Sequence, residues 1–140
     1  MARVKLQMPE KMGWSTDIAL RITDINYGNH MGNDALVSLL HEARVQYLNH
    51  LGYTELSLEG VALIQSDLAV EYKKEVFYPD NLTIKIATGE ISTMGFELYY
   101  HVFNKEGKEI AKAKTGMVCF NYKSRKIMPV PKLFLGQVNP

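Results

Sequence analysis

The sequence predicts a single domain of the α+β class, in which a curled antiparallel sheet wraps around one long central helix. Apolar residues recur at three- and four-residue steps from Leu36 to Leu51, which is typical of a buried helix. After residue 60 the apolar pattern changes to period two, which is typical of strands. The links between these strands are short, so the strands are expected to pair antiparallel. A flat sheet cannot bury a helix, and the sheet is therefore expected to curl.

The first part of the chain divides into a lead-in, a strand and the helix. Residues 1–15 have no periodic pattern and form an N-terminal lead-in, which leaves 16–140 as the domain, with no shift in composition that would mark a linker. Alternation at 16–24 predicts a strand with Ile18, Leu20 and Ile22 on one face. Either Asn33 or Asp34 is expected to cap the helix, and Gly52 is expected to end it.

Four further extended segments are predicted at 61–76, 81–92, 95–104 and 109–122. A turn at 78–81 separates the first of these segments from the second, and a polar hairpin at 105–108 separates the third from the fourth. If the strand at 61–76 lies at the edge of the sheet, its unpaired backbone groups are expected to pair with a second copy of the chain. The sequence therefore predicts a homodimer or a dimer of dimers.

Composition excludes several classes of partner. The 140 residues hold 16 basic and 15 acidic side chains without a long run of one sign, so neither nucleic acid nor a membrane is an expected partner. The one cysteine, Cys119, lies in an apolar run and is interpreted as a buried structural thiol. Without an internal disulfide, a signal peptide pattern or a membrane-spanning stretch, a soluble cytoplasmic protein is expected.

A polar loop just before the helix is the strongest candidate for chemistry. His30 carries an imidazole, which titrates near neutral pH and suits a base that activates water; the alternative is a loop histidine that only hydrogen-bonds a backbone carbonyl. Asn26 and Asn33 have amides suited to orienting a water or polarising a carbonyl oxygen. The same two residues are equally suited to loop bracing and helix capping.

The run Asp24-Ile-Asn26-Tyr-Gly-Asn29-His30-Met-Gly32-Asn33, with Arg44 eleven residues further on, resembles a motif of hotdog-fold acyl-CoA thioesterases. In the 4-hydroxybenzoyl-CoA thioesterase branch the motif reads Asp-x-Asp-x-x-Gly-His-Val-Asn-Asn. The resemblance covers roughly residues 16–130 and implies a hotdog fold. It also implies that the chain hydrolyses an acyl-CoA or acyl-carrier thioester without a cofactor. It further suggests a pantetheine contact at Thr93, Met94 and Gly95, a segment that also suits an ordinary hairpin.

One departure from the family pattern concerns the base. The family's second motif Asp is its catalytic carboxylate, and Asn26 stands there; an amide has no basic lone pair for that role. Asp24, Glu42 and Asp67 are the possible replacements. Asp24 is interpreted as a loop brace, and Glu42 as part of a helix face that is either solvated or ion-paired with Arg44. Asp67 lies in an apolar strand, where a carboxylate needs a partner; at a dimer edge it would approach the other subunit's loop.

The predicted catalytic set is therefore Asn26, His30, Asn33 and Asp67. Two alternatives remain open: a hotdog hydratase or dehydratase acting on a hydroxyacyl thioester, and a non-catalytic dimer that binds acyl thioesters. No metal site is predicted, because the four histidines lack partners at ligand spacing. Two larger groups have undecided roles. The aromatic residues that suit either core or acyl pocket are Tyr27, Tyr47, Tyr53, Phe77 and Phe96, and the basic candidates for substrate phosphate are Lys73, Lys74, Lys112, Lys114, Lys123, Arg125 and Lys126.

Overall fold

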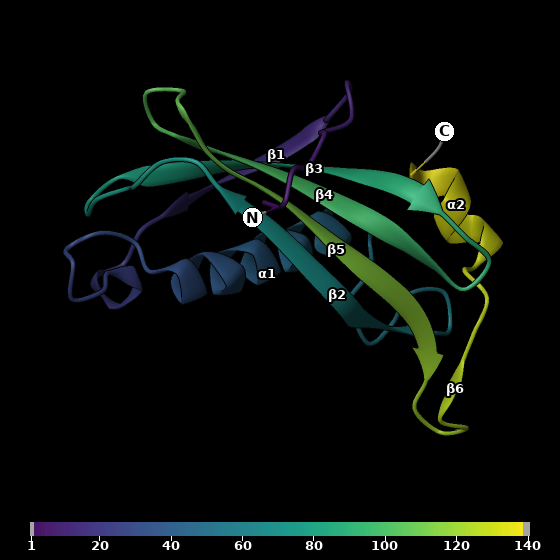
Figure 1. Ribbon diagram of the computed structural model, residues 1–140. Coiled ribbons are helices and arrows are strands. Elements are labelled where there is room, and N and C mark those ends of the chain that lie inside the picture. The colour runs from purple at the N-terminus through teal and green to yellow at the C-terminus, as the bar shows by residue number, and fades with distance from the viewer. Residues whose placement is uncertain (1, 139–140) are drawn as a thin grey trace.

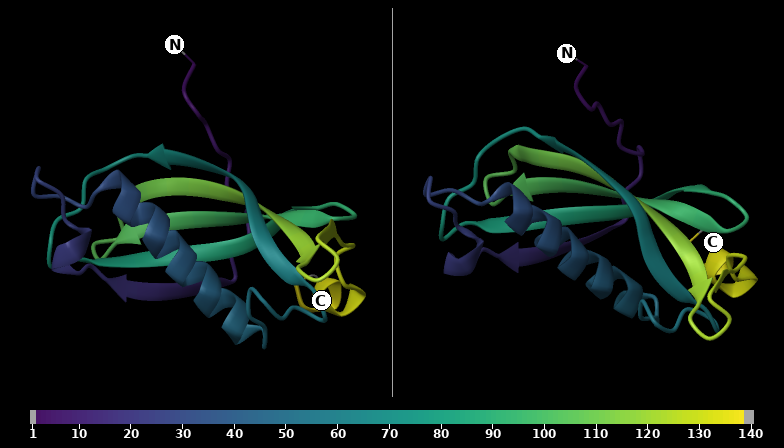
Figure 2. Two further views of the ribbon diagram at one scale, coloured as in Figure 1. Left: turned by 90° about the horizontal axis from the view of Figure 1, so that it is seen from below. Right: turned by 60° about the horizontal axis from the view of Figure 1, so that its bottom comes forward.

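The computed structural model describes residues 2–138. Its elements, in chain order, are β1 (Trp14–Ala19), the 3-10 turn η1 (Ile22–Asp24), α1 (Asn33–His50), β2 (Ala62–Tyr72), β3 (Asn81–Ile91), β4 (Gly95–Asn104), β5 (Glu109–Asn121), β6 (Lys126–Ile127) and α2 (Lys132–Val138). The five long strands pair antiparallel in the order β1-β3-β4-β5-β2, and β6 pairs with β5. The sheet curls over α1, which lies along its concave face (Figures 1 and 2). The predicted α+β architecture is confirmed.

The central helix begins and ends almost where the apolar pattern placed it. Its buried apolar residues are those expected, namely Leu36, Leu39, Leu40, Ala43, Tyr47 and Leu48. The prediction of its cap was wrong: Gly32 is the N-cap and no side chain caps the first turn. A Cβ on Gly32 would lie 2.6 Å from the Asp34 carboxylate, so the close approach of Asp34 favours glycine there. Gly52, at φ +90°, follows the helix as predicted.

The first strand is shifted from its predicted position. β1 already starts at Trp14, inside the expected lead-in, and ends at Ala19 instead of continuing to residue 24. The Asp24 carboxylate accepts a hydrogen bond from the backbone N–H of Arg21 at 2.8 Å, which closes the 3-10 turn. A backbone donor used in this turn is not available to a sheet ladder. Ile22, predicted to face the core, is consequently exposed.

The strand β2 occupies one edge of the sheet, which is the condition under which the sequence predicts pairing with a second copy. It carries a bulge. Gln65 pairs with Met117 and Asp67 with Gly116, so Ser66 between them has no paired residue on β5. The strand ends at Tyr72 rather than residue 76, because the backbone N–H groups of Lys73 and Lys74 both turn to the carbonyl of Ile110. Past the bulge, Asp67 and Glu71 face the outer surface of the sheet, opposite α1.

The lead-in crosses the outer face of the sheet (Figure 2). The backbone N–H of Leu6 donates to the Glu71 carboxylate at 3.0 Å, and the Leu6 carbonyl accepts from Lys112 Nζ at 3.3 Å. Residues 2–13 form neither helix nor strand, but they are tied to the sheet at this point. We call residues 2–8 the N-terminal arm.

The short helix α2 closes the end of the molecule near β6 and was not predicted. Its buried residue, Phe134, packs against Phe96 and Tyr53, with ring centroids 4.8 and 5.8 Å apart. A seven-residue helix with one buried side chain is too short to produce a recognisable period. No helix within residues 2–138 is both long and apolar enough to cross a membrane.

Cys119 is buried, as predicted. Burial disfavours the thiolate and raises the pKa of this thiol to about 11. We expect that the native protein does not react with a chromogenic thiol reagent near neutral pH, and that one thiol appears after unfolding. Absorbance with and without denaturant checks this. Rapid labelling of the native chain would contradict it.

Gly95 lies where two strands come unusually close. A Cβ at this position would lie 2.3 Å from the backbone carbonyl oxygen of Met117. A backbone atom cannot swing aside as a side chain can, so we expect Gly95→Ala to destabilise the fold by about 1–3 kcal/mol. Urea unfolding measures this loss. The matched control is Gly136→Ala, because nothing lies within 4 Å of a Cβ at that position. Equal stability of the two variants would contradict the prediction.

Candidate functional site

The polar loop before α1 is held by backbone hydrogen bonds at both ends. The Asn26 N–H donates to the His30 carbonyl at 2.9 Å, and Ile25 bridges to Met31. The Met31 N–H donates to the Val76 carbonyl at 2.8 Å, which ties the loop to the segment after β2. Asp24 is only 4% exposed and bonds to Arg21. These contacts agree with its predicted bracing role.

The side chains of Asn26 and His30 face one small space above Gly28. A Cβ on Gly28 would lie 3.2 Å from Asn26 Oδ1 and 3.3 Å from His30 Nε2. The Gly28 N–H donates to Asn26 Oδ1 at 2.8 Å, which fixes the direction of the amide. The Asn26 NH₂ group therefore remains as the donor of this side chain. A side chain at position 28 would crowd both groups, which favours glycine there.

One hydrogen bond determines which nitrogen of His30 is basic. His30 Nδ1 lies 3.0 Å from the Met31 carbonyl oxygen, which can only accept, so Nδ1 carries the proton. Nε2 of the neutral ring then keeps its lone pair. The nearest carboxylate, that of Glu75, is 3.7 Å from Nε2, too far for a good hydrogen bond. His30 does hydrogen-bond a backbone carbonyl, as the structural alternative for this residue predicts. This bond nevertheless leaves Nε2 available as a base.

A hollow of about 280 Å³ lies beside this loop and is lined by His30, Asn33, Tyr72 and the segment from Lys73 to Val76. Tyr72 reaches from β2 and donates its hydroxyl to the Asn33 carbonyl at 2.9 Å, which anchors the start of α1. No side chain caps the first turn of α1. The backbone N–H groups of this turn therefore have no side-chain cap, but the turn also carries the Asp34 carboxylate, whose charge opposes that of a bound anion.

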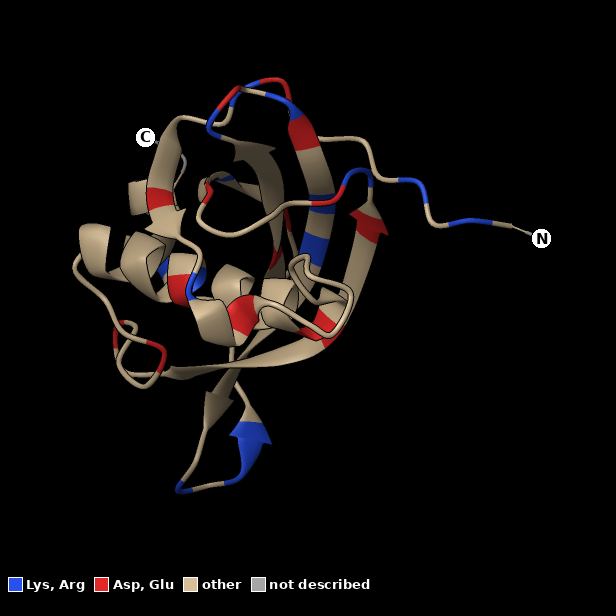
Figure 3. Ribbon diagram, turned by 90° about the vertical axis from the view of Figure 1, so that its left-hand side faces the viewer, with Lys and Arg blue, Asp and Glu red and all other residues tan. Residues whose placement is uncertain are grey.

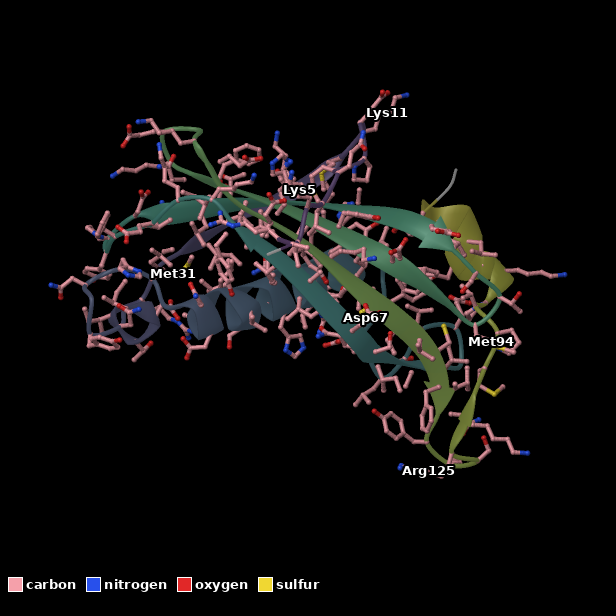
Figure 4. All side chains as sticks on the ribbon, in the orientation of Figure 1. Lys5, Lys11, Met31, Asp67, Met94 and Arg125 are labelled. Atoms are coloured by element: carbon pink, nitrogen blue, oxygen red, sulfur yellow. The ribbon has the colours of Figure 1, made fainter. Side chains whose placement is uncertain are left out.

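Asp67 does not join the His30 group. Its carboxylate accepts a hydrogen bond from the Gly116 N–H at 2.8 Å, and it lies on the outer face of the sheet. Figure 4 shows Met31 at one end of the molecule, Met94 at the other and Asp67 between them. Within the chain, the predicted catalytic set is thus divided into a loop group, Asn26, His30 and Asn33, and a separate Asp67.

The predicted pantetheine contact lies near Asp67. Met94 and Gly95 line a hollow of about 310 Å³ on the outer face, together with Ser66 and Gly116. Thr93 uses its carbonyl to accept from the Val130 N–H at 2.8 Å, so its backbone is occupied by the fold. Two carboxylates, Glu90 and Glu97, also line this hollow. Its lining otherwise consists largely of apolar side chains and backbone.

Of the two interpretations of Glu42, the solvated face holds and the ion pair with Arg44 does not. Residues two apart on a helix face different directions; Glu42 is exposed and accepts from Gln46 at 2.8 Å. Arg44 is 5% exposed and points into the core. There its guanidinium donates to Glu55 at 3.1 Å, to Gln65 at 3.0 Å and to the Tyr100 hydroxyl at 3.3 Å.

The basic residues whose roles the sequence left undecided have different hydrogen-bond and ion-pair partners. Lys73 pairs with Glu71 at 2.6 Å, Lys112 holds the Leu6 carbonyl, and Lys114 pairs with Glu97 at 2.8 Å. The hydrogen bond from Lys73 lowers the pKa of Glu71, so this carboxylate is charged at neutral pH. Sequence reasoning missed the N-terminal arm, whose Arg3 and Lys5 line a further hollow with Lys73. Its residues show no period, and only its bonds to β2 and β5 reveal its place.

The aromatic residues that suited either core or acyl pocket differ in their burial. Tyr47, Tyr53 and Phe96 are core residues, whereas Tyr27 and Phe77 are exposed. Tyr27 is fully exposed on the same loop as His30. Among residues 2–138, no three His, Cys, Asp or Glu side chains gather closely enough to hold a metal ion.

Comparisons with known proteins identify the family. The profile of the thioesterase-like superfamily matches residues 20–138. A 1,4-dihydroxy-2-naphthoyl-CoA hydrolase of Thermosynechococcus vestitus is 26% identical over 99 residues, which cover 69% of this chain and 68% of that protein. A protein of Aquifex aeolicus, named only as a proposed esterase, is 33% identical over 93 residues, covering 65% of this chain and 70% of that one.

Solved structures match over the whole domain. The DHNA-CoA thioesterase of Staphylococcus aureus superposes with a TM-score of 0.78 at 23% identity, covering 87% of this chain and 83% of that one. At this identity the likeness shows the fold. The profile match and the shared architecture agree with the motif around His30, and the chain belongs to the thioesterase-like superfamily of hotdog-fold proteins.

Proposed function

We propose that this protein hydrolyses acyl-CoA thioesters at the polar loop before α1. The observation that supports this most directly is the bond from His30 Nδ1 to the Met31 carbonyl, which leaves Nε2 as a base beside an open hollow. His30 lies beside the Asn26 amide at Gly28 and also lines the hollow next to the start of α1, whose N-cap has no side-chain hydrogen bond. These are the groups that water attack on a thioester carbonyl requires.

The reaction follows from these positions. Nε2 of neutral His30 takes a proton from water while the water oxygen attacks the carbonyl carbon. The carbonyl oxygen becomes an oxyanion, which the N–H groups at the start of α1 stabilise. The tetrahedral intermediate then collapses and the C–S bond breaks. The proton on the imidazolium passes to the leaving sulfur, which gives a free acid and a thiol.

Asn26 acts in this scheme by orientation. Its Oδ1 is held by the Gly28 N–H, and its NH₂ group is free to hold the attacking water beside His30 Nε2. The amide is not the base. Asn33 lies at the N-terminus of α1 and lines the same hollow, where its side chain suits a contact with the carbonyl oxygen.

Pairing of β2 edges brings the two separate groups of site residues together. The loop group adjoins the Tyr72 end of β2, Asp67 lies at the middle of the strand, and the hollow at Gly95 lies toward the Ala62 end. Antiparallel pairing with a second β2 reverses the strand direction. The Tyr72 end of one protomer then adjoins the Ala62 end of its partner. We propose that the register of this pairing sets Asp67 beside the partner's loop, where its carboxylate assists the protonated imidazole.

The printed name of one relative supports a particular class of acyl group for the substrate. The protein of Thermosynechococcus vestitus is named for an acyl-CoA with an aromatic acyl group, and the exposed Tyr27 ring on the site loop suits contact with such a group. We therefore expect aromatic acyl-CoAs to be better substrates than long-chain ones.

Thiol release from a panel of short, medium, long and aromatic acyl-CoAs tests the function. The chromogenic thiol reagent is suitable because Cys119 is buried. We expect free thiol in step with loss of thioester. A change in enoyl absorbance without thiol would favour a hydratase, and binding without turnover would favour a non-catalytic dimer; either result would contradict the proposal.

The exchange Asn26→Asp tests whether position 26 faces His30. The carboxylate keeps the bond from the Gly28 N–H and adds a negative charge beside Nε2, which favours the protonated imidazole. We expect the acid limb of the kcat/KM profile to move to higher pH. The matched control is Asn29→Asp, on the exposed side of the loop. Identical profiles for wild type and Asn26→Asp would contradict the assignment of this space.

A further inference from the structure

We propose that the hollow beneath the N-terminal arm binds the 3′-phosphorylated ADP end of coenzyme A. This inference rests on the proposed acyl-CoA substrate and names the part of the protein that recognises its nucleotide. The hollow has a volume of about 610 Å³ and is lined by residues 2–5 of the arm and residues 70–73 at the end of β2.

The arm is held in place by specific bonds. Both polar groups of the Leu6 backbone are engaged, the N–H by Glu71 and the carbonyl by Lys112, and both partners project from the outer face of the sheet. Beyond Leu6 the arm projects away from the sheet (Figure 2), and residues 2–5 line one hollow together with residues 70–73 of β2 and its end. Figure 3 shows the basic positions of the arm in blue beside the end of the sheet, and Figure 4 labels Lys5 there.

The charge of this hollow suits a polyanion. Its charged lining residues are Arg3, Lys5, Lys73 and Glu71, so cations outnumber the one carboxylate, which is already paired with Lys73. The hollow at Gly95 carries Glu90 and Glu97 without a basic lining residue and would repel phosphates. The chain as a whole has a formal net charge of only +1, so this excess is local.

The position of the hollow suits the length of the substrate. It shares Tyr72 and Lys73 with the hollow that contains His30 and Asn33, so the two adjoin at the end of β2. Lys74, which follows Lys73 in the chain, lines the hollow that contains His30. A thioester at His30 can therefore lead, through its pantetheine chain, to phosphates at the arm. A further basic hollow, lined by Lys85 and Lys105, shares no lining residue with the His30 hollow.

The chemistry of the side chains distinguishes two phosphate groups. The planar guanidinium of Arg3 suits bidentate contact with a terminal phosphate such as the 3′-phosphate. Lys5 supplies a point charge that suits the bridging diphosphate. Lys73 is already oriented by Glu71. The arm thereby provides a reason for the enzyme to prefer coenzyme A over a carrier protein, which presents pantetheine without the nucleotide.

The test compares variants across truncated substrates. Arg3→Gln, Lys5→Gln and the double variant are assayed by thiol release with one good acyl group attached to coenzyme A, to 3′-dephospho-coenzyme A and to N-acetylcysteamine. The control is Lys105→Gln, which removes one positive charge from the separate basic hollow. We expect the double variant to raise KM for acyl-CoA about tenfold, with kcat and the N-acetylcysteamine reaction unchanged. Lys105→Gln is expected to match wild type.

The substrate series identifies the atoms contacted. Loss of the 3′-phosphate is expected to raise the wild-type KM, and Arg3→Gln is expected to have no further effect on the dephospho substrate. Equal KM for all variants with acyl-CoA would overturn the proposal, as would equal losses on all three substrates. Failure of the proposed function is distinct, because then wild type releases no thiol from any substrate. In that case, binding of 3′-phospho-ADP alone, measured by calorimetry, still tests the hollow.

Discussion

His30→Gln is expected to lower kcat for the best acyl-CoA by about 100-fold or more, with little change in stability. A positioned general base contributes about 10²–10⁴ in rate, and glutamine retains a polar group near the Met31 carbonyl while removing the basic nitrogen. Figure 4 places the loop at the surface, and the His30 side chain is 28% exposed, so the core does not depend on it. Thiol release and urea unfolding on the same preparations measure both effects.

The pH dependence adds a second readout. A protonated imidazole cannot accept a proton from water, so wild-type kcat/KM should fall toward acid pH, and this fall should be absent in His30→Gln. The matched control is His50→Gln, at the far end of α1, where the ring packs near Trp14. Full activity of His30→Gln, or an equal loss in His50→Gln, would show that another group activates the water.

Arg44→Met is expected to destabilise the fold by about 3–5 kcal/mol. The side chain is 5% exposed, and its loss leaves the Glu55 carboxylate, the Gln65 amide and the Tyr100 hydroxyl without their shared donor. Burial already raises the pKa of Tyr100, as expected for a phenol in the core. The free energy of unfolding in urea measures the loss.

A second variant separates lost charge from lost packing. The double variant Arg44→Met with Glu55→Gln removes both charges, and we expect it to recover part of the stability lost in Arg44→Met. Arg125→Met, in an exposed turn, serves as the control and should change stability little. If Arg44→Met is as stable as Arg125→Met, the buried network does not hold α1 to β2.

The parts of the fold that the sequence predicts are those set by long periodic patterns. The apolar steps from Leu36 to Leu51 extend over five turns, and the alternation in the strands from residue 81 onward defines their buried faces. The position of β2 at the sheet edge was only a condition in the sequence argument, and the strand order of the folded sheet is what establishes it. The loop group of Asn26, His30 and Asn33 was predictable because a dense polar run adjoins the helix, and neighbours in sequence remain neighbours in space.

The remaining features depend on contacts that no local pattern encodes. Arg44 finds Glu55, Gln65 and Tyr100, from three different segments, only after the helix packs on the sheet. The end of β1 is set by the turn that Asp24 closes, and the arm is placed by bonds across more than sixty residues. The separation of Asp67 from His30 likewise emerges only when the strands are arranged.

Subunit mixing of His30→Ala and Asp67→Asn tests the central claim, a hydrolytic site built from two protomers. The asparagine oxygen of Asp67→Asn still accepts from the Gly116 N–H, so the fold is retained. Each variant alone is expected to be nearly inactive. After exchange of an equal mixture, half the dimers are mixed and each has one intact site, so about one quarter of wild-type thiol release should return. No recovery despite demonstrated exchange, or full activity of Asp67→Asn alone, would contradict the account.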